Sequence, residues 1–127
     1  MPKKNAADLI DRVRKIALSL EDATEKLSHG APTFFAYGRV FAMIDNHHHD
    51  SGHVAVWCPA PPGAQESLVA ADPKHFFRPP YVGPSGWIGV RLNSGLPWPV
   101  IGDFIRQAHE MNAQRKKTRR RAAPRRG

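Results

Sequence analysis

The N-terminal part of the chain repeats apolar residues with the period of an α-helix. Four of them stand at intervals of four and three residues and share one face: Leu9, Val13, Ile16 and Leu20. Asn5 is a favourable N-cap, and Asp8 places a negative charge in the first turn, where the helix dipole stabilises it. The pattern predicts a helix that begins after Asn5 and buries this apolar stripe.

Downstream of this helix the hydrophobic period changes to two, which is typical of β-strands. Residues 33–37 and 40–44 are two such segments, joined by a tight Gly-Arg turn. Residues 53–58 form a third segment, which ends at the prolines of 59–62 because proline cannot donate to a strand ladder. The three segments predict an antiparallel meander.

The remainder of the chain predicts two helices and one further strand. Residues 64–72 form a short helix that Pro73 ends, and residues 74–86 form an aromatic, proline-rich connection with room for a short strand. Residues 87–92 alternate again and predict a strand. A last helix follows with Pro99 in its first turn. Its expected buried face comprises Ile101, Phe104, Ile105, Ala108 and Met111.

This order of elements predicts an α+β fold. A β-meander and one further strand would form an antiparallel sheet, with the helices packed on one face. Residues 1–113 hold the apolar periodicity, so we expect them to form a single domain. Beyond Ala113 the apolar content ends, and we expect residues 114–127 to be a disordered tail rich in Lys and Arg.

Positive charge is concentrated in this tail. The chain has 127 residues and a formal net charge of +8. Residues 115–127 contain eight Lys or Arg and no acid, so the rest holds 19 − 8 = 11 basic residues against all 11 acidic ones. A solvated cationic segment neutralises phosphates and releases counterions without reading sequence. The first candidates for nucleic-acid contact are therefore Arg115, Lys116, Lys117, Arg119, Arg120, Arg121, Arg125 and Arg126.

A second basic group surrounds the proline-rich connection. Lys74, Arg78, Tyr81 and Arg91 place cations among aromatic residues, a mixture that suits phosphate contact and base stacking. The alternative is that the aromatic residues belong to the core and the charges form a solvated rim. The sequence leaves both interpretations open.

Histidines cluster between the second and third predicted strands. His47, His48, His49 and His53 share one short loop with aspartates, and both residue types ligate metals. A hairpin tip does not build the closed four-ligand shell of a structural zinc site, so we expect no metal site here. Protonated histidines in this loop would strengthen phosphate contact as the pH falls below about 6.5.

The other polar residues form no catalytic or cofactor motif. Ser28 and His29 are neighbours, but adjacent side chains usually diverge and no nucleophile elbow surrounds the serine. Cys58 is the only cysteine, so no internal disulfide forms. We expect no enzymatic activity and no cofactor. The chain has neither an apolar signal region nor the roughly 20 apolar residues of a membrane helix, so we expect a cytoplasmic protein.

Three stretches closely resemble the bacterial MmcQ/YjbR family: TEKLSHGAPTFFAYGRVFAMI, VAVWCPAPPGAQESLVAADP and FFRPPYVGPSGWIGVRLN. The resemblance spans roughly residues 8–112 and includes the pair Arg78 and Pro79 and the strand-opening Trp87. It implies a CyaY-like α+β fold with a double-wing arrangement proposed to bind DNA. It also implies a bacterial protein, for which we add an association with the nucleoid as an expectation. The basic tail lies outside the resemblance.

The residues and the resemblance together predict a non-enzymatic DNA-binding protein. Its tail would contact phosphates without sequence specificity and in a salt-dependent way, with help from the face around Lys74 to Arg91. RNA stays open as a partner, a membrane is not expected, and a monomer is assumed. The alternative is a small-ligand or protein-binding module with an accessory tail. Its pocket would lie beside the sheet and be lined by Trp57, Tyr81 and Trp87.

Overall fold

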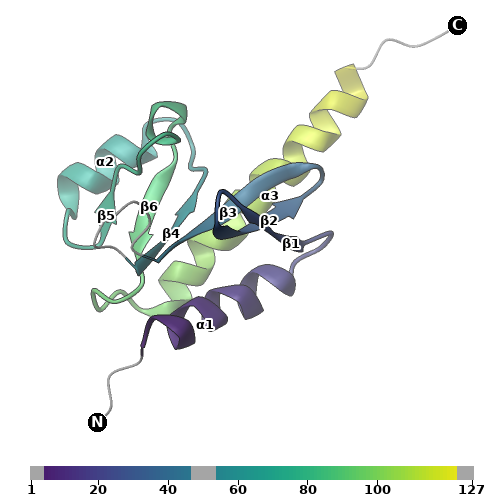
Figure 1. The fold of residues 1–127 in the computed structure, drawn as a ribbon. Helices are drawn as coiled ribbons and strands as arrows, with labels where there is room; N and C mark the ends of the chain where they lie inside the picture. Colours follow the sequence, from purple (N-terminus) through teal and green to yellow (C-terminus); the bar gives the residue numbers. More distant parts are fainter. Residues whose placement is uncertain (1–4, 47–53, 123–127) are drawn as a thin grey trace, which may run out of the picture.

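A computed structural model describes residues 5–46 and 54–122, with side chains up to residue 119. These residues form helices and strands in the order α1-β1-β2-β3-β4-α2-β5-β6-α3, with a short 3₁₀ helix, η2 (Gly83–Ser85), before β6 (Figure 1). The predicted α+β fold is confirmed.

The strands form one antiparallel sheet in the spatial order β1-β2-β3-β4-β6-β5. β2, β3 and β4 are the predicted meander, and β6 is the predicted further strand. The short strand for which the proline-rich connection left room is β5. The bounds are β1 (Thr24–Ser28), β2 (Ala31–Ala36), β3 (Arg39–Asn46), β4 (Val54–Cys58), β5 (Phe76–Phe77) and β6 (Ile88–Arg91).

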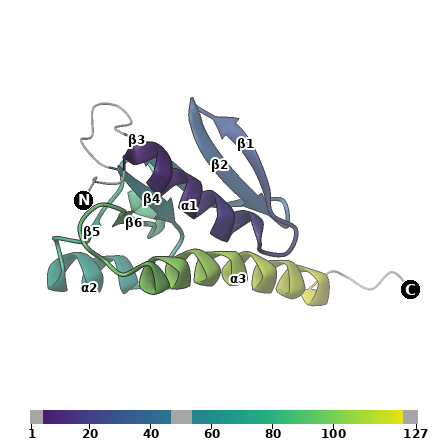
Figure 2. The same cartoon turned by 90° about the horizontal axis from the view of Figure 1, so that it is seen from below.

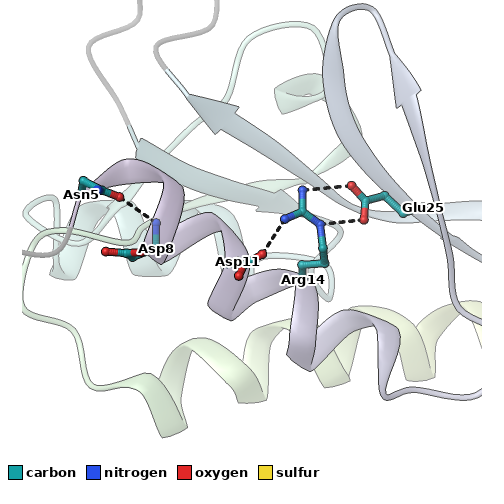
Figure 3. Close-up of polar contacts among 5 residues, drawn as sticks. All are labelled: Asn5, Asp8, Asp11, Arg14 and Glu25. Atoms are coloured by element: carbon teal, nitrogen blue, oxygen red, sulfur yellow. Dashed lines mark hydrogen bonds and ion pairs between the residues drawn. The ribbon is translucent and has the colours of Figure 1, made fainter.

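Helix α1 (Ala6–Leu18) begins where the sequence predicts. The side-chain oxygen of Asn5 accepts a hydrogen bond of 2.9 Å from the backbone N–H of Asp8 (Figure 3). This bond satisfies one of the backbone donors that a helix leaves unpaired at its start. The apolar stripe faces the core, where the buried residues are Leu9, Ile10, Val13 and Ala17.

Strand β1 is absent from the sequence-based prediction because its residues carry no alternating pattern. Leu27 is 77% exposed, and most of the strand faces solvent. Its neighbours hold it in place. All of β1 pairs with β2, and Glu25 receives two hydrogen bonds from Arg14 of α1, at 2.8 and 3.1 Å (Figure 3). Long-range pairing therefore produces this edge strand, against the pattern of its own side chains.

The core lies between one face of the sheet and the helices. α3 (Trp98–Ala122) packs along β2, β3 and β4 and against α1, while α2 (Ala64–Ala71) packs beside β5 (Figure 2). The largest fully buried apolar side chains of the strands are Phe34, Phe41, Ile44, Val56, Ile88 and Val90. On α3, Ile101, Ile105 and Ala108 are buried as predicted, and Phe104 and Met111 are half-buried.

The structure differs from the prediction at the end of α3. We expected disorder from residue 114, but the helix continues to Ala122, and residues 123–127 lie outside the described part of the chain. A helix needs apolar residues for packing, not for its own backbone hydrogen bonds. Once the packed part of α3 has formed, each added residue extends it easily, and Gln, Arg, Lys and Ala all favour helix.

Candidate nucleic-acid interface

The C-terminal part of α3 carries most of the residues predicted to bind nucleic acid. Its exposed cations are Arg115, Lys116, Lys117 and Arg119. The helical backbone continues through Arg120 and Arg121, while Arg125 and Arg126 lie outside the described residues. In both views this end of α3 projects beyond the strands (Figure 1, Figure 2). The first cations of the supposed tail therefore sit on an ordered, protruding helix.

No acidic side chain of this helical end balances its cations. The sequence contains no Asp or Glu after Glu110. Among the residues whose side chains are described, every salt bridge lies elsewhere in the fold. Lys116 Nζ lies 5.2 Å from the centroid of the Tyr37 ring, a cation–π contact that keeps the charge. The positive charge is thus available to an external anion.

Buried polar side chains fix the root of this helical end to the body of the protein. Asn112 Nδ2 donates to the backbone carbonyl of Arg39 at 3.0 Å and to two neighbouring carbonyls at 3.3 Å. His109 Nε2 lies 2.6 Å from the backbone carbonyl of Glu21, so this nitrogen carries the proton and donates. These bonds tie α3 to the start of β3 and to the segment after α1. The basic end therefore has a defined direction.

The second predicted group lies around β5 and the loop that follows it. Lys74 and Arg78 are exposed, and Tyr81 is 75% exposed. Arg91 is half-buried. Its Nη1 donates to two backbone carbonyls before β5, at 2.9 and 3.3 Å, and its guanidinium lies 4.9 Å from the Phe77 ring centroid. β5 and the C-terminal end of α3 are far apart in both views, so the structure does not bring the two groups together (Figure 1, Figure 2).

The aromatic residues around this second group differ in their roles. Phe76 is buried in the core, and Phe77 lies across the sheet against Gly89, where an added Cβ would come within 2.5 Å of its ring. Both phenylalanines therefore serve packing, as the alternative interpretation expected. Trp87 is half-buried and lines a cavity instead.

This cavity has a volume of about 530 Å³ and lies between α3 and two loops. One wall is formed by the start of β3, with Arg39 and Val40, and by α3, with Met111, Asn112 and Arg115. The other wall is formed by the 59–62 and 84–87 segments and includes Pro59, Pro62, Pro84 and Trp87. Sequence reasoning missed it because its walls come from four separate stretches of chain. The two signals that could have indicated it are the arginine that begins β3 and the tryptophan before β6.

The alternative interpretation, a ligand-binding module, placed a pocket beside the sheet, lined by Trp57, Tyr81 and Trp87. Of these, Trp87 lines the cavity. Trp57 is 2% exposed, and its indole N–H donates to the buried Asp45 at 3.2 Å. Tyr81 is not among the residues that line this cavity. The cavity beside α3 therefore shares one of the three residues that the alternative named.

The remaining residues considered in the sequence are placed as follows. Cys58 is fully buried, and burial raises the pKa of its thiol to about 12. Ser28 and His29 lie at the β1–β2 turn, where His29 has a positive φ of 52°. The histidines of the loop, His47 to His49 and His53, lie outside the described residues. In the described part of the chain, no helix is long and apolar enough to cross a membrane.

The fold and this surface define a class: small α+β proteins with an antiparallel sheet backed by helices, here extended by a basic helical end. The chain belongs to the YjbR family, whose model matches residues 18–111. The match ends before Arg115, so the basic end of α3 lies outside it. A comparison with curated proteins finds no match to this chain.

A solved structure has the same fold. It is the crystal structure of Deinococcus radiodurans protein DR2400, which carries the domain DUF419. The TM-score is 0.69 at 18% sequence identity, over 80% of this chain and 76% of that one. At this identity the likeness establishes the fold alone.

Proposed function

We propose that this protein binds nucleic acid non-enzymatically, with duplex DNA as the first partner, through the C-terminal end of α3. The observation that carries the proposal is a set of exposed cations on a protruding helix, none of which forms a salt bridge among the described residues: Arg115, Lys116, Lys117 and Arg119. YjbR family membership is compatible with this function but does not assign it.

The helical form of this end suits a groove of DNA. Successive residues of an α-helix are about 100° apart, so the cations point around the helix instead of forming a single stripe. Arg115 and Arg119 share one side, and Lys116 and Lys117 take others. A helix is about 10–12 Å wide and the major groove of B-DNA about 12 Å, so cations on several sides reach both phosphate walls.

Such contacts give affinity without reading bases. Each neutralised phosphate contributes about −0.9 to the slope of log K against log salt, so the described cations account for about −3.6 and all eight Lys and Arg of residues 115–127 for about −7. The binding is therefore non-specific and falls steeply with salt. The group around Lys74 lies apart from α3 and forms a separate, secondary contact region.

The proposal is tested in the full chain by changing the described cations of α3 to glutamine, which keeps helix propensity. Binding to a labelled duplex is measured by fluorescence anisotropy at several salt concentrations. The matched control removes equal charge elsewhere, at Arg12, Lys15, Lys26 and Arg106, all of them exposed. We expect the α3 variant to lose roughly half of the salt slope and at least tenfold in affinity at about 0.1 M salt.

Two results would contradict the proposal. One is an α3 variant that binds the duplex no more weakly than the charge-matched control. The other is a wild-type protein that does not bind duplex at physiological salt.

A further inference from the structure

We infer that the cavity between α3 and the 84–87 loop receives one unpaired nucleotide of a single-stranded nucleic acid, its base against Trp87 and its phosphate at Arg39 and Arg115. The inference rests on the proposed nucleic-acid function and deepens it. It assigns the protein a second mode of binding, in which a base leaves the stack. Four features of the cavity carry it.

The first feature is charge. Arg39 and Arg115 both line the cavity, and no Asp or Glu is among its described lining residues. Arginine presents a planar fork of donors that matches the oxygens of a phosphate. Arg115 is also the first cation of the basic end of α3, so the cavity lies at the root of the surface proposed to bind phosphates.

The second feature is the apolar part of the lining. Trp87 stands with Pro59, Pro62, Pro84 and Met111, so an indole lies among flat or flexible apolar side chains. Every nucleobase has a π-face, and aromatic side chains that stack bases are the usual platform for single strands. At about 530 Å³ the cavity falls within the range of 300–1,000 Å³ that small-molecule sites occupy.

The third feature is that two buried amide side chains hold both walls in place. Gln65 of α2 donates to the backbone carbonyls of Gly83, at 2.9 Å, and Trp87, which fixes the loop with the tryptophan. Asn112 donates to the carbonyl of Arg39 at 3.0 Å, which fixes the start of β3 with its arginine. Because the walls are ordered before binding, the entropic cost of binding a ligand is lower.

The fourth feature is a path for the rest of the strand. A neighbouring hollow of about 640 Å³ also includes Arg39, Met111 and Arg115 and continues along α3 to Arg119. Glu110 is the one acidic residue of its described lining, and it precedes Arg115 and Arg119 on α3. A base paired in a duplex cannot enter a cavity, whereas single strands present splayed bases. The occupant is therefore a single strand.

The test compares a fluorescein-labelled (dT)₁₀ strand with a labelled duplex, using the full chain and anisotropy. Trp87→Ala should bind the single strand about five- to a hundredfold more weakly and the duplex unchanged, and Trp87→Phe should keep most of the affinity. Arg39→Gln should weaken the single strand more than the duplex and reduce the single-strand salt slope by about 0.7. Arg106→Gln, an exposed arginine of the same helix that does not line the cavity, is the control for charge alone.

The outcomes separate the two proposals. If wild-type protein binds duplex but Trp87→Ala binds (dT)₁₀ as well as wild type does, the nucleotide site is wrong and the proposed function stands. If wild-type protein binds neither probe, both proposals fail. Circular dichroism checks the fold of Trp87→Ala. Should that variant unfold, Arg39→Gln decides, because its side chain is exposed, and an equal loss for both probes overturns the site.

Discussion

At the scale of single residues, two buried amides determine the surface that we propose as functional. Gln65 and Asn112 are 7% and 5% exposed, and each donates to backbone carbonyls of a distant segment. An amide in the core that left its donors unpaired would be costly, so each side chain holds its partner loop in one position. Neither residue belongs to an apolar pattern. Each stabilises the surface through hydrogen bonds to backbone carbonyls of a remote segment.

Cys58 gives a prediction at this scale. Burial raises the pKa of its thiol from the ordinary value of 9.0 to about 12, so at pH 8 the native protein holds an unreactive thiol. We expect a thiol reagent such as DTNB to label Cys58 in guanidinium but not in the native protein. Because the unfolded thiol ionises first, the free energy of unfolding should fall as the pH rises from about 9 towards 12. Rapid labelling of native protein at pH 8 would contradict the assignment.

At the scale of elements, α3 combines two roles that follow one another along a single helix. Its first half buries Ile101, Ile105 and Ala108 in the core, and its last part carries cations into solvent. The packed half overcomes the cost of helix nucleation, and the basic part extends a helix that already exists. The charges are thereby held on a rigid, directed element, where a disordered segment would spread them over many conformations.

A substitution at Thr118 tests whether the helical form matters apart from the charge. Thr118→Pro removes a backbone donor and kinks the helix before Arg119, while Thr118→Ala favours helix, and neither changes a charge. We expect the proline variant to bind duplex DNA several-fold more weakly and to lose helical signal in circular dichroism, with the alanine variant like wild type. Equal duplex affinity for both would show that charge alone is sufficient.

At the scale of the whole molecule, the two basic groups occupy different positions on the fold. The chain has a net charge of +8, but Lys74 and Arg78 lie near β5 while the end of α3 projects from the opposite side (Figure 1). Screening in physiological salt limits the reach of each group to about 8 Å. We therefore expect the two groups to act as separate surfaces.

A pair of double variants tests this separation at equal net charge. Arg115→Gln with Arg119→Gln removes two cations from α3, and Lys74→Gln with Arg78→Gln removes two near β5. We expect the α3 pair to lower duplex affinity several-fold more than the β5 pair, measured by anisotropy at about 0.1 M salt. Equal losses from the two pairs would mean that binding follows net charge and not the surface of α3.

Much of the fold could be read from local patterns. The helical stripe of α1, the alternation in β2, β3, β4 and β6, and the proline that ends α2 each predicted their element. These elements bury side chains with their own period, so the sequence of each segment carries the information. The basic residues of the C-terminal part were also evident, because charge does not depend on folding.

Three features were decided only by the tertiary structure. β1 exists because β2 and Arg14 pair with it, the helix of residues 114–122 exists because it continues a packed helix, and the cavity exists because distant walls meet. In each case the stabilising partner lies outside the segment concerned. A local pattern records which side of a segment is apolar, whereas hydrogen bonds and walls supplied by remote residues form only after the chain has folded.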